Sequence, residues 1–155
     1  MIPLADLKIT EDEFDPSRLI AHWTWRVPVH FQPLFLSTFG DWFFCDPDDR
    51  VYLFDLVAGE LKQIADSRAE FEALLELEEY QREWLMSHLV EQLRRLSILR
   101  PRGQCYAFRT PPILGGQLSP SNIVVWDLET YQSGTAKIHR QIGGLPPGTQ
   151  VVIPS

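Results

Sequence analysis

The residues of this chain that could perform chemistry are few and widely spaced. Its only cysteines are Cys45 and Cys105, which form no Cys-x-x-Cys pair, so the sequence gives no support to a zinc site built on thiolates. Cys105 and His139 could form the thiolate–imidazole pair of a small cysteine-dependent enzyme. Cys105 lies in an apolar run, however, where a thiol behaves as a small hydrophobic side chain. We therefore favour a structural role for Cys105 and predict that the chain is not an enzyme.

Other residue types that bind metals or phosphates also lack the spacing that such sites need. The chain has four histidines, namely His22, His30, His88 and His139. No two of them stand four residues apart, as the zinc ligands of a metalloprotease helix do. The glycine pair at 115–116 is not followed by the Lys–Ser/Thr of a phosphate-binding loop, and no Gly-x-Ser-x-Gly motif is present. We expect no cofactor.

A group of aspartates at 46, 48 and 49 could in principle bind a hard cation. A calcium loop needs six to eight oxygen ligands and normally ends in a glutamate, which is missing here at the expected spacing. Proline at position 47 and the flanking aspartates are typical of a tight turn, because aspartate accepts hydrogen bonds from nearby backbone amides. We interpret Asp46, Asp48 and Asp49 as a polar hairpin turn and expect no metal.

One stretch of the chain has an unusual excess of carboxylates. Between Asp66 and Glu83 there are seven carboxylates against Arg68 and Arg82. Six glutamates of this stretch are the candidate partner-binding residues: Glu70, Glu72, Glu76, Glu78, Glu79 and Glu83. Such a run is usually the solvated face of a helix. The functional alternative is an acidic surface that accelerates the encounter with a basic partner.

The overall charge supports a protein partner and argues against others. The formal net charge is −7, so the chain repels phosphate backbones and anionic membranes. We expect no direct contact with nucleic acid and no membrane binding. The sequence shows no secretory signal and no apolar run long enough for a membrane span, and two free thiols suit a reducing compartment. The sequence thus predicts a cytoplasmic protein.

The segment from 37 to 65 predicts three strands that would hold this surface in place. The expected strands are Asp41–Cys45, Val51–Asp55 and Glu60–Ala65, joined by turns at 46–49 and 58–59. A short helix capped by Asp15 precedes them, because Pro16 suits the first helical turn. Later in the chain we expect strands at 105–108 and 122–131, a helix at 135–142 and a terminal strand at 149–153.

The acidic stretch itself predicts two helices. Ser67 and Glu70 have the spacing of a capping box, and an apolar stripe follows that consists of Phe71, Leu74, Leu75 and Leu77. A second helix is expected from about Glu79 to Leu96. His88 lies on the apolar face of that helix, so we expect it to be packed or partly buried.

Helix and strand signals are partly segregated along the chain, which favours an α+β fold over a regular βαβ repeat. We predict a mainly antiparallel sheet with helices packed on one side. Residues 1–18 are expected to form an acidic N-terminal segment, and residues 19–153 a single α+β domain.

Several stretches, in order, resemble a known family. These are Phe39-Gly40-Asp41-Trp42-Phe43, Val51-Tyr52-Leu53-Phe54-Asp55, Gly59-Glu60-Leu61, Gly103-Gln104-Cys105-Tyr106-Ala107-Phe108, Pro111-Pro112-Ile113-Leu114-Gly115-Gly116 and Ile138-His139-Arg140-Gln141. Their order from about residue 19 to 152 is similar to the C-terminal domain of type VI secretion immunity proteins that neutralise DNase effectors. Better-described members carry an extra N-terminal domain, related to an insert of some tRNA synthetases. Since only residues 1–18 precede the similar stretch, that domain is expected to be absent.

The resemblance implies a cytoplasmic protein that binds a cognate toxin and blocks its active site or assembly, with no catalytic residues of its own. Two alternatives stay open. One is a general protein-interaction module of the kind found in yeast cell-wall-assembly regulators and their bacterial relatives, with no toxin partner. The other is the small cysteine-dependent enzyme that would use Cys105 and His139.

Overall fold

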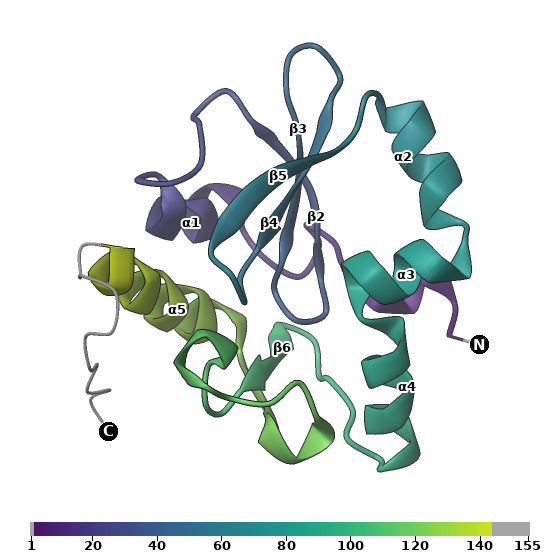
Figure 1. Ribbon diagram of the computed structural model, residues 1–155, viewed down its shortest axis with the longest axis vertical. Helices are drawn as coiled ribbons and strands as arrows, with labels where there is room; N and C mark the ends of the chain where they lie inside the picture. The colour runs from purple at the N-terminus through teal and green to yellow at the C-terminus, as the bar shows by residue number, and fades with distance from the viewer. Residues whose placement is uncertain (1, 144–155) are drawn as a thin grey trace.

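A five-stranded antiparallel sheet lies at the centre of the computed structural model, which describes residues 2–143 (Figure 1). The strands follow one another in chain order: β1 (Lys8–Ile9), β2 (Gln32–Ser37), β3 (Trp42–Cys45), β4 (Val51–Asp55) and β5 (Glu60–Ala65). The last three confirm the predicted strands and their turns. The predicted α+β class with a mainly antiparallel sheet is also confirmed.

The strands β1 and β2 were not expected from the sequence. β2 contains Pro33, and a proline argues against a strand because it cannot donate a ladder hydrogen bond. The register between β2 and β3 shifts between Pro33 and Phe35, so this irregularity accommodates the proline. β1 has only two residues, which pair with Ser37 and Leu36, and such a short strand has no detectable alternation.

The side chains of β3 alternate between two hydrophobic clusters. Trp42 and Phe44 point to one face of the sheet and Phe43 to the other, and all three are fully buried. Because successive side chains of a strand point to opposite faces, a strand that is apolar at every position needs a cover on both faces.

Helices supply a cover on each face, on opposite sides of the sheet in Figure 1. On the Phe43 face lie α2 (Arg68–Leu75), α3 (Glu78–Leu85) and α4 (Ser87–Arg95). On the Trp42 face lie α1 (Pro16–Ile20) and α5 (Leu128–Gly143). The expected packing of helices on one side only was therefore wrong in this detail, because the apolar residues of β3 at both faces require two layers.

The second predicted helix is divided in two. Met86, between α3 and α4, has a left-handed backbone with a φ of +49°, which ends one helix and starts the next in a new direction. As a result α4 buries Leu89, Val90 and Leu93, whereas His88 is exposed. The expectation that His88 is packed or partly buried was therefore wrong. It assumed one straight helix from Glu79, whereas the chain changes direction at Met86 and His88 is exposed to solvent.

A second sheet has two strands, β6 (Gln104–Phe108) and β7 (Ile123–Asp127). It joins the main fold where the Tyr106 amide donates to the Thr38 carbonyl at 2.8 Å. The strand expected at 122–131 ends at Asp127, whose carboxylate accepts from the Thr130 amide and so starts α5 earlier than predicted. Short 3-10 helices complete the fold: η1 (Leu4–Leu7), η2 (Ala21–Trp23), η3 (Pro112–Leu114) and η4 (Pro120–Asn122). The strand expected at 149–153 lies outside the described residues.

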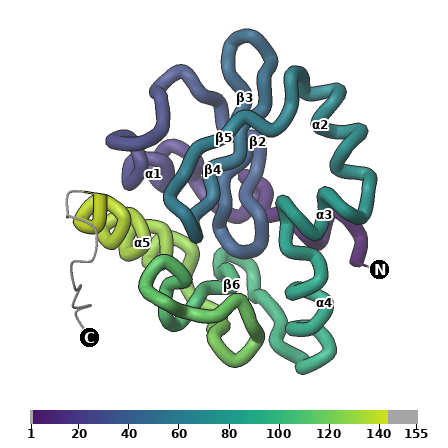
Figure 2. Tube along the Cα trace, in the orientation of Figure 1, coloured from purple at the N-terminus to yellow at the C-terminus, as the bar shows by residue number. Residues whose placement is uncertain are grey.

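The N-terminal segment packs into the fold. Leu7 and Ile9 are fully buried, one in each hydrophobic cluster. The Asp15 carboxylate accepts from the amides of Ser17 and Arg18, which confirms the predicted cap of α1. The chain trace in Figure 2 shows how the segment leads from the N-terminus into the sheet. Within residues 2–143, no helix has the length and apolar character that crossing a membrane would require.

Candidate functional site

The helices α2 and α3 present the acidic surface, by which we mean Glu70, Glu72, Glu76, Glu78, Glu79 and Glu83. All six glutamates are exposed to solvent. Ser67 starts α2 as predicted, since its hydroxyl accepts from the Glu70 amide at 3.1 Å. On the opposite side of the two helices, Phe71, Leu75, Trp84 and Leu85 are buried in the core. The apolar contacts thus fix the helices and leave their carboxylates to the solvent.

These glutamates differ from several acidic residues of the N-terminal segment, which have ion-pair partners. Three acids of that segment are paired with arginines at the end of α4 and just after it: Asp6 with Arg94 at 3.6 Å, Asp12 with Arg102 at 3.1 Å and Glu13 with Arg100 at 2.8 Å. Across the part of the chain that the structure describes, no ion pair within 4 Å includes a member of the acidic surface. Six carboxylates without an ion pair among the described residues thus lie within fourteen residues, on α2 and α3.

One edge of the acidic surface contains a cation of its own. Lys8 lies with Glu72 and Glu76 along a groove of about 330 Å³, and its ammonium is 4.5 Å from the centre of the Phe35 ring. Burial lowers the pKa of Lys8, while attraction from Glu72 and Glu76 opposes this change. The charge of these two glutamates is thus partly compensated, and the other four carry most of the surface's field.

The junction of α2 and α3 exposes an apolar side chain within the acidic surface. Leu77, expected in the apolar stripe, is 47% exposed and flanked by Glu76 and Glu78. Its position differs from the prediction because α2 ends at Leu75, so Leu77 starts α3 instead of continuing the buried stripe. An exposed leucine ringed by charges is a suitable apolar contact for a partner.

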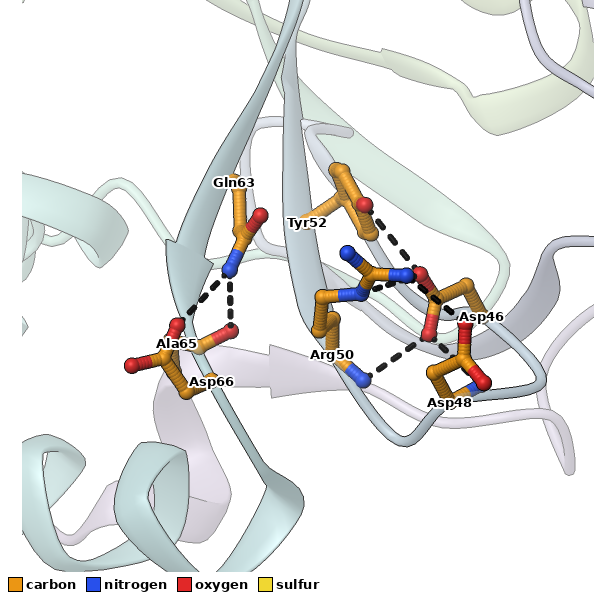
Figure 3. A network of polar contacts seen from close by, with 7 residues as sticks. All are labelled: Asp46, Asp48, Arg50, Tyr52, Gln63, Ala65 and Asp66. Atoms are coloured by element: carbon orange, nitrogen blue, oxygen red, sulfur yellow. Dashed lines mark hydrogen bonds and ion pairs between the residues drawn. The ribbon is translucent and has the colours of Figure 1, made fainter.

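The aspartates at 46–49 serve the β3–β4 hairpin, as predicted (Figure 3). The Asp46 carboxylate accepts from the Arg50 side chain and from the Tyr52 hydroxyl, each at 3.1 Å. Burial raises the pKa of Asp46, but hydrogen bonds from the backbone of Arg50 and from Tyr52 outweigh it, and the pKa is lowered. Asp48 pairs with Arg50 at 2.7 Å. Among residues 2–143, no three histidine, cysteine or carboxylate side chains are arranged to hold a metal ion.

A buried carboxylate lies behind the α3–α4 junction, and sequence reasoning did not single it out. Asp41 accepts from the Leu56 amide at 2.8 Å and from the Ser37 hydroxyl at 3.0 Å. Burial, followed by repulsion from Asp55, raises the pKa of Asp41 to about 7. No local pattern marks this residue, because its burial depends on strands and helices distant in sequence.

The comparison with known families concerns the part of the chain that carries the acidic surface. The model of the family T6SS immunity protein Tdi1, C-terminal, matches residues 65–139. Over this segment, just under half of the chain, the protein is similar to the Tdi1 C-terminal family. The segment contains α2, α3 and α4, both strands of the small sheet and most of α5. The resemblance to type VI secretion immunity proteins, inferred from the sequence, is thereby confirmed.

Comparison with whole proteins supports the fold. No curated protein matches the chain. Among solved structures, the crystal structure of Atu4351 from Agrobacterium tumefaciens has 20% sequence identity over 80% of this chain, with a TM-score of 0.56. The chain spans 65% of the length of that protein. At this identity the likeness shows a shared fold.

Two residues of the Tdi1-family segment were considered as a catalytic pair, and the structure gives each another environment. Cys105 is fully buried, and burial raises the pKa of its thiol. The His139 Nε2 donates to the Leu56 carbonyl at 2.6 Å, a contact that defines its tautomer. No hydrogen bond joins Cys105 and His139 among the described residues. The arrangement lacks the geometry of a thiolate–imidazole pair.

We expect Cys105 to resist alkylation in the folded protein near neutral pH, because its thiol is both buried and protonated. Its reaction with iodoacetamide, followed by mass spectrometry, should be at least about a hundredfold slower than in the denatured chain. The denatured protein serves as the control within the same experiment. Rapid labelling of Cys105 in the folded state would contradict this environment and revive the enzymatic alternative.

Proposed function

We propose that this chain is an immunity protein that binds a cognate secreted bacterial toxin and neutralises it by occluding its working surface. The family match over residues 65–139 carries the proposal, since that family consists of type VI secretion immunity proteins. The same residues hold every member of the acidic surface. The segment that matches the family is thus also the one with the excess of carboxylates.

The charge of this surface supports a basic partner. A toxin that acts on nucleic acid, such as a DNase, needs a positively charged cleft to hold its phosphate-rich substrate. Six exposed glutamates that form no ion pair within residues 2–143 offer that cleft a complementary surface, and the exposed Leu77 adds an apolar contact within it. Occupation of the cleft would exclude the substrate by charge and by volume, and the immunity protein would need no catalytic group. The neutralisation takes place in the cytoplasm, before the toxin reaches its target.

We expect the loss of three charges on α3 to slow formation of the toxin complex. The variant Glu78→Gln, Glu79→Gln and Glu83→Gln keeps the side-chain shape but removes the charge. Because electrostatic steering acts on the encounter, the association rate at low ionic strength should fall about tenfold, while the dissociation rate changes little. Stopped-flow or surface-plasmon kinetics with the product of the neighbouring gene measures both rates.

A matched control separates position from total charge. Glu11, Glu60 and Glu91 lie outside the acidic surface and are exposed or partly exposed, and their replacement by glutamine removes the same charge. This control should keep the association rate within about twofold of the unmodified chain, because steering depends on the local field. Equal slowing by both triple variants would show that net charge, and not the acidic surface, controls binding.

A further inference from the structure

The hydrogen-bond register of the small sheet determines which backbone groups of β7 face outward. At one end of the ladder the Arg109 amide donates to the Asn122 carbonyl at 2.7 Å, and at the other the Leu128 amide donates to the Gly103 carbonyl at 3.2 Å. Bonded pairs alternate with non-bonded pairs in an antiparallel ladder. Between these ends, the β7 residues that form hydrogen-bonded pairs with β6 are therefore Trp126 and Val124.

The remaining residues of β7 direct their backbone groups away from β6. Ile123, Val125 and Asp127 occupy the non-bonded positions, so their amides and carbonyls point to the outer edge. Tyr106, the β6 residue opposite Val125, confirms this alternation, because its amide donates to the Thr38 carbonyl and not to β7. The Ile123 amide is already bonded, because it donates to the Pro120 carbonyl at the end of η4. The Asp127 carbonyl precedes α5 and accepts the first bond of that helix. The outer edge therefore presents two amides, of Val125 and Asp127, and two carbonyls, of Ile123 and Val125.

No other strand pairs with this outer edge among residues 2–143. The edge also lacks the usual protection against strand pairing, since β7 reads Ile-Val-Val-Trp-Asp, without a lysine or a proline. Trp126, a residue of this strand, is 48% exposed. An apolar edge strand with an exposed tryptophan is a template for a further strand.

We propose that the outer edge of β7 binds an extended strand of the toxin, which adds to the small sheet as a third strand. The Ile123 carbonyl, both backbone groups of Val125 and the Asp127 amide would form the ladder, and Trp126 would pack against the added strand's side chains. This inference rests on the proposed function and identifies a second contact of the same partner, in addition to the acidic surface.

The dimensions and charge of this edge favour the toxin over a second copy of the chain. β7 has five residues, and such a strand is about 17 Å long. A ladder of that length alone falls short of the roughly 800 Å² per partner that a stable interface buries. The net charge of −7 further opposes pairing of two copies. A toxin that also contacts the acidic surface supplies both the missing area and the opposite charge.

Val125→Pro is the variant that tests the ladder. Proline removes the outward amide of Val125 and leaves the inward ladder of Trp126 and Val124 in place, which edge strands tolerate. We expect toxin affinity to fall about tenfold or more, which corresponds to the loss of one backbone hydrogen bond together with a steric block. Val125→Thr keeps the amide and the β-branched shape that suits a strand, and its affinity should stay within about threefold of the unmodified chain. Equal affinities of the two variants would overturn the inference.

Amide hydrogen exchange of the unmodified chain gives a readout that does not depend on a variant's folding. In the free protein the amides of Val124 and Trp126 should be protected and those of Val125 and Asp127 should exchange quickly. Toxin binding should then protect Val125 and Asp127. If the amides of Val125 and Asp127 are already protected in the free chain, the inference is overturned. Protection that depends on protein concentration would indicate that a second copy covers the edge. Protection that does not depend on it would indicate that the chain's own remaining residues cover it.

The same experiment distinguishes this inference from the function on which it rests. A stable toxin complex in which Val125 and Asp127 continue to exchange quickly contradicts the strand addition alone. Failure of the chain to bind the toxin at all contradicts the proposed function and, with it, the strand addition.

Discussion

Replacement of Gln132 by leucine is expected to lower the free energy of unfolding by about 3–4 kcal/mol, because three buried polar groups lose their partner. Gln132 is fully buried in α5. Its Oε1 accepts from the indole nitrogens of Trp23 at 2.6 Å and of Trp42 at 3.0 Å, and its Nε2 donates to the Gly40 carbonyl at 2.7 Å. One amide therefore links α5 to η2, to β3 and to the turn before β3.

The neighbouring turn leaves little freedom to repair this loss. Gly40 has a φ of +88°, and a Cβ at this position would lie 2.9 Å from the Gln132 Nε2. The turn thus packs directly against the Gln132 amide, and leucine has no group to bind the Gly40 carbonyl or either indole nitrogen. Each unpaired buried donor or acceptor costs roughly 1–3 kcal/mol, partly offset by the gain from burying an apolar side chain.

Urea unfolding followed by tryptophan fluorescence measures the effect. The control is Gln92→Leu, the same substitution at an exposed position of α4, which should change the free energy of unfolding by less than about 0.5 kcal/mol. A loss below about 1 kcal/mol for Gln132→Leu would show that the two indoles and the Gly40 carbonyl find other partners.

The second large effect is a dependence of stability on pH that arises from Asp41. Burial raises the pKa of Asp41 to about 7 in the folded chain, whereas the unfolded chain has the ordinary value near 3.8. The folded state therefore holds this proton more tightly than the unfolded state. The resulting stability is complete below about pH 4 and is lost as the pH rises through about 7. We expect the free energy of unfolding to fall by an amount on the order of 3 kcal/mol over this window.

Asp41→Asn removes the titrating group and keeps an oxygen for the Leu56 amide. The variant should lack the decline between pH 4 and 7 and should therefore be more stable relative to the unmodified chain at pH 8 than at pH 5. Denaturation midpoints across this pH range provide the measurement. Carboxylates with a lowered pKa, such as Glu13, act in the opposite direction and at lower pH, so they do not mask the effect. Parallel pH profiles of the two proteins would contradict the assignment.

The elements that sequence reasoning predicted correctly are those with a local cause. Asp15 and Ser67 accept hydrogen bonds from amides two or three residues away, so their types and positions suffice to identify a helix start. The turn at Asp46 likewise depends on backbone and side-chain contacts within six residues. The strands β3 and β4 follow from their aromatic and branched residues.

The elements that it missed depend on contacts distant in sequence. β2 forms despite Pro33 because a register irregularity accommodates the proline, and no local pattern signals this. Met86 adopts a positive φ without being a glycine or an asparagine, so the division between α3 and α4 has no residue signal. The second helix layer follows from Phe43 and Trp42 pointing to opposite faces, but which helix covers which face is set by tertiary packing.

The features of the candidate site likewise divide into those with a local cause and those that depend on contacts distant in sequence. The glutamates of the acidic surface are identified by their number within a short stretch, and their exposure follows from the buried stripe of Phe71 and Leu75. Three acids of the N-terminal segment are paired because Arg94, Arg100 and Arg102 approach from another part of the chain, which the sequence alone does not reveal. The open edge of β7 could not be predicted either, because it requires the ladder register.

Titration of the product of the neighbouring gene with this chain, with complex formation and toxic activity followed in the same samples, tests the immunity role most directly. Toxin activity should fall in proportion to the complex formed and should disappear when all toxin is bound. A toxin that forms the complex and stays fully active, or one that forms no complex with the chain, would contradict neutralisation by occlusion.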